Sequence, residues 1–131
     1  MFGWLRKKTA PLTGAPAVRR QKTYSAQSGY VYQYFYEGHR ATSLERGTEY
    51  VFNVSSDRKT SFPVSVILGE DAVESWQDQS GRALSAAERY AIAKMALFQS
   101  FDERESPEAM RDAVRVTPDD VRAFLTTLDI D

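Results

Sequence analysis

Four tyrosines occupy alternate positions in one short stretch of the chain: Tyr30, Tyr32, Tyr34 and Tyr36. Successive side chains of a β-strand point to opposite faces, so a strand over residues 30–36 carries all four rings on one face. Aromatic residues also favour strands. The four rings therefore form either a platform that binds a ligand or one wall of the hydrophobic core.

Two more segments, residues 48–55 and 61–68, alternate in the same way, and a short strand is predicted over residues 22–26. One face of the three main strands is almost entirely apolar, and there the tyrosines are joined by Tyr50, Phe52, Val54, Phe62, Val64, Val66 and Leu68. The opposite face is mixed, with Val31, Gln33, Phe35, Val51, Asn53, Ser55, Pro63, Ser65 and Ile67. Because a half-buried antiparallel sheet turns its more apolar face to the core, we expect the tyrosines to line the core.

Helical signals follow the strands. Helices are predicted over residues 70–79, over residues 86–101, from Pro107, and from residue 118 to about residue 128. Ser85 and Glu88 form a capping box ahead of the second helix, and Thr117 is an N-cap ahead of the last. Strands followed by helices indicate the α+β class. We predict an antiparallel sheet of three or four strands with the helices packed on one face.

The 131 residues fit one folded domain. Residues 1–20 contain prolines, glycines and basic residues, which predicts a basic flexible N-terminal tail and linker, followed by a single α+β domain over residues 21–131. Residues 1–22 carry six basic residues and no acidic one, whereas the rest of the chain carries 11 basic and 18 acidic residues. Such a tail binds nucleic acid or an anionic membrane, folds back on its own domain, or makes no specific contact.

The sequence lacks the residues that most enzyme active sites and metal sites require. There is no cysteine and one histidine, His39, which excludes thiolate and histidine-rich metal sites. No phosphate-binding loop, dinucleotide fingerprint or nucleophile elbow occurs. We place His39 in a solvent-exposed loop after Glu37-Gly38, the alternative being an acid or base paired with Glu45 or Glu49. We therefore predict no metal, no cofactor and no catalytic residue.

Residues 1–8 place four apolar side chains ahead of Arg6-Lys7-Lys8, which resembles an interfacial anchor but buries too little for more than weak membrane contact. No apolar run approaches the roughly 18 residues that span a bilayer. We therefore expect a soluble, cytoplasmic protein. The stretch from Gly81 to Glu103 resembles a bacterial family of unknown function, and this resemblance implies no site residues.

Lys94 falls in the middle of the apolar face of the helix over residues 86–101. Lysine is almost never fully buried without a partner. Three arrangements are open: the stem runs along the apolar surface with the ammonium in water, the ammonium pairs with an acid or with tyrosine hydroxyls, or the side chain lines a pocket between sheet and helix. In the third arrangement an anionic ligand is held by Tyr32, Tyr34, Tyr90 and Lys94.

Three functions follow from these patterns. The leading hypothesis is a non-catalytic module that binds a protein partner or self-associates through the mixed face of the sheet, whose apolar and uncharged polar residues suit an interface. The second is single-stranded nucleic-acid binding by exposed tyrosines and five basic residues, namely Arg19, Arg20, Lys22, Arg58 and Lys59. The third is binding of a small anionic ligand in the pocket at Lys94.

Overall fold

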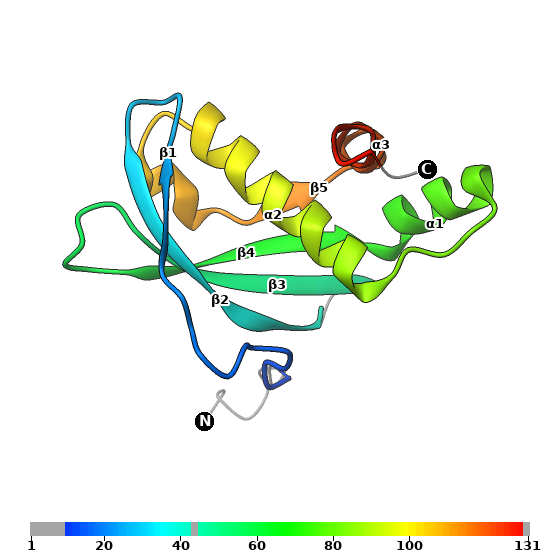
Figure 1. Ribbon diagram of the computed structural model, residues 1–131, viewed down its shortest axis with the longest axis horizontal. Helices are drawn as coiled ribbons and strands as arrows, with labels where there is room; N and C mark the ends of the chain where they lie inside the picture. Colours follow the sequence, from blue (N-terminus) through cyan, green and yellow to red (C-terminus); the bar gives the residue numbers. More distant parts are fainter. Residues whose placement is uncertain (1–9, 43–44, 130–131) are drawn as a thin grey trace, which may run out of the picture.

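The computed structural model describes residues 10–42 and 45–129. The elements in chain order are β1 (Lys22–Ser25), β2 (Val31–Ala41), β3 (Gly47–Ser55), β4 (Phe62–Gly69), α1 (Glu70–Ser80), α2 (Ala86–Glu103), the 3₁₀-helix η2 (Pro107–Arg111), β5 (Val114–Val116) and α3 (Pro118–Thr127). Figure 1 shows two layers, in which a curled sheet carries α1, α2 and α3 on one side. The α+β prediction is therefore confirmed.

The sheet has five strands in the order β1-β2-β3-β4-β5. The first four are antiparallel neighbours, and β5 runs parallel to β4. The prediction of a purely antiparallel sheet of three or four strands is therefore wrong in this respect. Because β5 has only three residues, its sequence is too short to show the alternation of apolar and polar side chains that indicates a strand. Its parallel direction depends on the crossover through α1 and α2, since parallel strands need a long connection.

The tyrosine face of β2 packs against α2, so the prediction that these rings line the core holds for Tyr32 and Tyr34. Tyr32 stacks on Phe101 with 4.3 Å between ring centroids, and Tyr34 meets Phe98 edge-on at 5.6 Å. Their exposed fractions are 0% and 7%, respectively. Tyr30 precedes β2 and is 39% exposed. Aromatic stacking thus joins the sheet to α2.

A β-bulge at Glu37 changes which side chains of β2 face the helices. Tyr36 pairs with Phe52, the register then shifts, and His39 pairs with Tyr50. An extra residue in a strand turns the following side chains to the opposite face. His39 therefore shares a face with Tyr36 and Tyr50 and belongs to a strand, not to the loop we predicted.

Residues 13–21, which we call the strap, lie beside the outer edge of β2. Thr13 and His39 exchange two backbone hydrogen bonds, at 2.9 and 2.8 Å. The next pairing point joins Lys22 to Tyr34, so eight strap residues span four residues of β2. The excess length makes the strap arch away from the strand edge. Contacts with the sheet thus begin inside the segment predicted as a tail, before residue 21.

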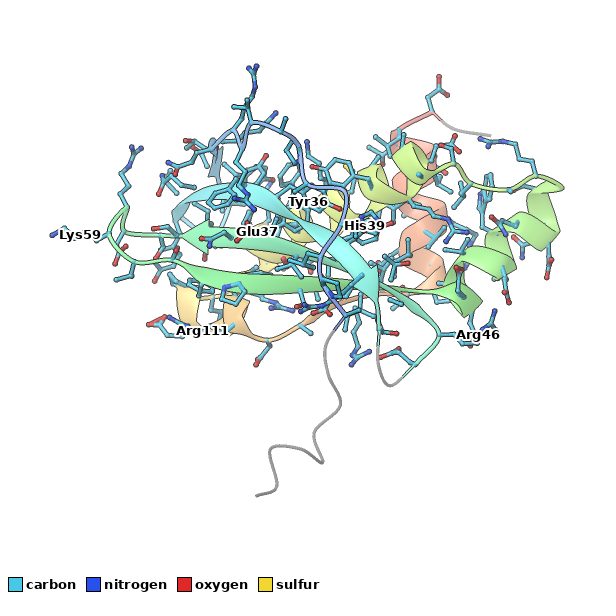
Figure 2. The ribbon with its side chains drawn as sticks, turned by 90° about the horizontal axis from the view of Figure 1, so that it is seen from below. Tyr36, Glu37, His39, Arg46, Lys59 and Arg111 are labelled. Carbon is cyan, nitrogen blue, oxygen red and sulfur yellow. The ribbon has the colours of Figure 1, made fainter. Side chains whose placement is uncertain are left out.

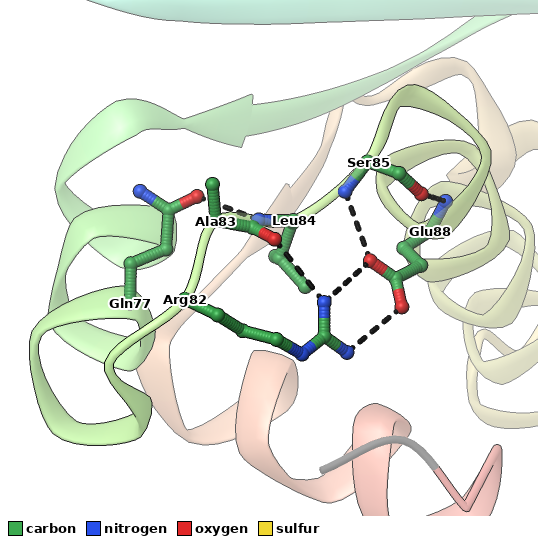
Figure 3. Close-up of polar contacts among 6 residues, drawn as sticks. All are labelled: Gln77, Arg82, Ala83, Leu84, Ser85 and Glu88. Carbon is green, nitrogen blue, oxygen red and sulfur yellow. Dashed lines mark hydrogen bonds and ion pairs between the residues drawn. The ribbon is translucent and has the colours of Figure 1, made fainter.

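The loop between α1 and α2 is fixed by side chains, which sets where α2 begins over the sheet. The predicted capping box is present, with Ser85 Oγ accepting from the Glu88 N–H at 3.1 Å and Glu88 accepting from the Ser85 N–H at 2.9 Å (Figure 3). Arg82 adds two bonds to the Glu88 carboxylate, at 3.1 and 2.9 Å. With the backbone N–H of Ser85, Arg82 lowers the pKa of Glu88 to about 2.

Candidate ligand-binding site

A cleft of about 630 Å³ opens between the strap, β2, β3 and the first half of α2. Its size falls within the range of small-molecule sites, roughly 300–1,000 Å³. It exists because the strap arches away from β2 while α2 crosses above the sheet. Figure 2 shows Tyr36, Glu37 and His39 of β2 beside the N-terminal segment that forms the outer wall.

The floor of the cleft is aromatic. Tyr34, Tyr36 and Tyr50 come from the sheet and Tyr90 comes from α2. The Tyr90 ring lies 4.7 Å from that of Tyr36 and 6.4 Å from that of Tyr50. Burial raises the pKa of all four phenols. The hydroxyls therefore stay protonated at neutral pH and remain able to donate hydrogen bonds.

Three basic side chains line one end of the cleft: Arg20 from the strap, Lys22 from β1 and Lys94 from α2. Lys94 Nζ lies 5.8 Å from the ring centroids of Tyr90 and Phe98. Burial, and then repulsion by Lys22, lowers the pKa of Lys94. Within the described ranges these three cations form no ion pair, and no carboxylate lines the cleft. We call them the cationic end.

The other end of the cleft holds the single histidine. His39 Nδ1 lies 2.9 Å from the Tyr36 hydroxyl. The ring packs against the strap at Gly14, where an added Cβ would lie 2.6 Å from His39 Cε1. Arg89 also lines this end, and its guanidinium is held by Glu70 at 2.8 Å. We call Tyr36 and His39 the polar pair.

The structure brings three of the four predicted ligand residues together. Tyr34, Tyr90 and Lys94 line the cleft. Tyr32 does not, because it is fully buried under Phe101, and its hydroxyl has no hydrogen-bond partner among the described residues. Sequence reasoning missed the polar pair, Tyr50 and the strap. The Glu37-Gly38 sequence fits a β-bulge as well as the bend we predicted. A bulge there places the His39 side chain on the face toward the helices.

The five basic residues predicted to contact nucleic acid divide between two regions. Arg20 and Lys22 lie at the cleft. Arg19 pairs with Glu37 at 3.0 Å and lies over the Phe35 ring, 6.0 Å from its centroid. Arg58 and Lys59 lie in the turn between β3 and β4, and Figure 2 shows Lys59 far from Tyr36 and His39. Nucleic-acid binding stays a prediction.

The mixed face of the sheet offers less apolar surface than its sequence indicated. Val51 is 5% exposed and Gln33 is 3% exposed, whereas Val31 is 43% exposed. Polar contacts occupy the neighbouring positions: Arg40 Nε pairs with Glu49 at 2.9 Å, and Glu49 also accepts from the Ser65 hydroxyl. Binding of a protein partner through this face stays a prediction.

Comparison with protein-family models, curated proteins and solved structures found no match for the chain. The resemblance of residues 81–103 to a bacterial family therefore has no support from a family model. In the part of the chain that the structure describes, no three acidic or histidine side chains gather as metal ligands would. None of the helices there is long and apolar enough to cross a membrane.

Proposed function

We propose that the protein binds a small organic anion with an apolar body in the cleft, without catalysing its conversion. One observation carries this proposal: an aromatic cleft of about 630 Å³ that is lined by three cations without an ion-pair partner in the described ranges and by no carboxylate. Such a cleft offers apolar contact and unbalanced positive charge together.

The apolar body and the anionic group of such a ligand each contribute to its binding free energy. Apolar surface that leaves water to cover the tyrosine rings contributes roughly 25 cal/mol per Å². An anion beside Lys22 and Lys94 relieves the repulsion that, with burial, lowers the pKa of Lys94. The cationic end is partly open to water, so each cation contributes about 1 kcal/mol or less. Apolar contact therefore supplies most of the affinity, and the charge selects anions.

The anionic group is a carboxylate or a phosphate. Lysine binds both as a point charge, whereas the planar guanidinium of Arg20 can hold two oxygens of either group at once. Decanoate and decyl phosphate, titrated separately into the full-length protein, distinguish the two. A ligand with one apolar chain and one head group tests the cleft with few other variables.

The first test is calorimetric titration of the protein with decanoate and with decanol, which has the same chain and no charge. We expect decanoate to bind and decanol to bind at least tenfold more weakly. Lys94→Met keeps an unbranched apolar stem and removes the ammonium, and it should weaken decanoate about fivefold, which is about 1 kcal/mol.

Lys59→Met is the matched control, because it makes the same chemical change in the turn between β3 and β4, far from Tyr36 and His39 (Figure 2). This variant should bind decanoate as the unchanged protein does. The proposal fails if neither decanoate nor decyl phosphate binds. It also fails if Lys94→Met and Lys59→Met bind decanoate equally well.

A further inference from the structure

We infer that the ligand is elongated and carries a second polar group at its far end, an oxygen that accepts a hydrogen bond from the polar pair of Tyr36 and His39. This inference rests on the proposed function and narrows its ligand to an acid with an ω-hydroxyl, ω-carbonyl or ω-carboxyl group. It comes from the opposite end of the cleft, where none of the three cations lies.

The two ends are separated because α2 runs antiparallel to β2 along the cleft. Tyr36 of β2 meets Tyr90 of α2, and further back along the strand Tyr34 meets Phe98. Lys94 therefore lies toward Tyr34 and Lys22. Ala86 and Ala87, at the start of α2, lie toward His39, and both line the cleft.

The Tyr90 ring lies between the two ends. Its centroid is 4.7 Å from that of Tyr36 and 5.8 Å from Lys94 Nζ. Tyr50 borders the same surface, with 6.4 Å between its ring centroid and that of Tyr90. A ligand that reaches both ends therefore needs an apolar segment no longer than a chain of about ten carbons.

The polar pair keeps one free donor in either neutral tautomer of the histidine. If the Tyr36 hydroxyl donates to His39 Nδ1, the ring carries its proton on Nε2 and can donate it to a ligand. If Nδ1–H donates to the Tyr36 oxygen, the tyrosine hydrogen is free instead. In both cases the 2.9 Å contact leaves one polar hydrogen for an acceptor oxygen.

One other cation lines this end, and its charge is already balanced by a carboxylate. Arg89 is already held by Glu70, with 2.8 and 3.3 Å between its Nη1 and the two carboxylate oxygens. Gly14 lets the strap pack against the histidine ring, since any Cβ there would lie 2.6 Å from Cε1. A polar ligand end thus meets a donor there, whereas a methyl end would leave the donor without a partner and lose affinity.

The test compares decanoate with 10-hydroxydecanoate and decanedioate on the full-length protein. We expect each bipolar acid to bind about fivefold more tightly than decanoate, as one net hydrogen bond contributes. In the double variant Tyr36→Phe with His39→Leu, which removes both polar hydrogens of the pair, this preference should fall below about twofold. Decanoate binding by the double variant also shows that it is folded.

Tyr34→Phe is the matched control, since it removes a hydroxyl at the cationic end of the same floor and should keep the preference. Decanoate binding with no preference for either bipolar acid overturns this inference and leaves the proposed function standing. A preference that survives in the double variant also overturns it. Failure of all three acids to bind overturns the proposed function, and the inference falls with it.

Discussion

The tyrosines of β2 alternate along its whole interface with α2, yet one end of this interface is closed and the other is open. Tyr32 is fully buried and stacks on Phe101 of α2 at 4.3 Å. Tyr36 is half-buried and lines the cleft with His39. Since both ends share one strand and one helix, the difference arises from what covers the edge of the sheet.

At the closed end, β1 and the turn that follows it are bonded directly to α2. Tyr24 stacks on Phe98 at 4.7 Å, and its hydroxyl donates to Asp102 Oδ2 at 2.7 Å. The other oxygen of this carboxylate accepts from the backbone N–H of Gln27 at 2.9 Å. These contacts draw the edge of the sheet against the helix and exclude water from the rings beneath.

At the open end, the strap makes no comparable contact with α2 among the described residues. Every residue of the strap is exposed, including Val18 at 67%. Between its two paired ends, the strap is held to β2 by the ion pair of Arg19 with Glu37, at 3.0 Å. A short bonded turn thus closes one end of the interface, while a segment longer than the strand it spans leaves a cleft at the other.

The largest expected effect comes from truncating an aromatic ring of α2 at each end. Phe101→Ala removes a fully buried ring and should lower the free energy of unfolding by about 3–5 kcal/mol. Tyr90→Ala removes a ring that already borders the cleft and should cost about half as much. Urea denaturation at neutral pH measures both. Equal losses would mean that the open end is packed as tightly as the closed one.

Glycine substitutions give a smaller effect and compare the backbone at the two ends. Gly14 in the strap has φ +81° and Gly29 before β2 has φ +98°, conformations in which any other residue is strained. The Cβ added by Gly29→Ala has no atom within 4 Å, so this variant should lower the free energy of unfolding by only about 1 kcal/mol. Gly14→Ala adds a contact of 2.6 Å with His39 Cε1.

Gly14→Ala should therefore displace the strap or the histidine ring as well as cost stability. We expect it to lower the free energy of unfolding by about 1–2 kcal/mol and to shift the amide NMR signals of Thr13 and His39. Gly29→Ala should leave those signals unchanged. If the two variants perturb His39 equally, the strap does not pack against that ring.

The elements of the fold were more predictable than the sheet they form. Local patterns placed both helix starts, because the capping boxes at Ser85 and Thr117 depend on residues three positions apart. Alternation placed β2, β3 and β4 for the same reason. The parallel strand β5 was missed, since its three residues gain meaning only beside β4, whose partner Val66 is 48 positions away from Val114 in the chain.

The candidate site was predictable only where one helix face meets one strand face. Helical periodicity placed Tyr90 and Lys94 on the side that faces the sheet, and strand alternation added Tyr34. Neither pattern indicates which end of a strand is covered, so Tyr32 could not be told apart from Tyr36. That distinction depends on contacts such as Tyr24 with Asp102, which are 78 residues apart in the chain.

The smallest expected effect is a dependence of stability on pH at the closed end. Burial, and then the hydrogen bond to Asp102, raises the pKa of Tyr24 to about 12 from its ordinary value of 10.0. Above pH 10 the unfolded chain therefore loses the Tyr24 proton while the folded protein keeps it until about pH 12. The stability contributed by this hydroxyl is complete below pH 10 and declines as the pH rises through that window.

Tyr24→Phe should accordingly lose less stability between pH 9 and pH 11 than the unchanged protein loses. The difference should stay below about 1 kcal/mol, because Tyr24 is only half-buried and water screens its charge. Urea denaturation of both proteins at the two pH values measures it. Tyr36→Phe makes the same change at the open end, where burial also raises the tyrosine pKa but no carboxylate accepts from its hydroxyl. If Tyr24→Phe follows the unchanged protein between the two pH values, the bond to Asp102 does not hold the closed end as described.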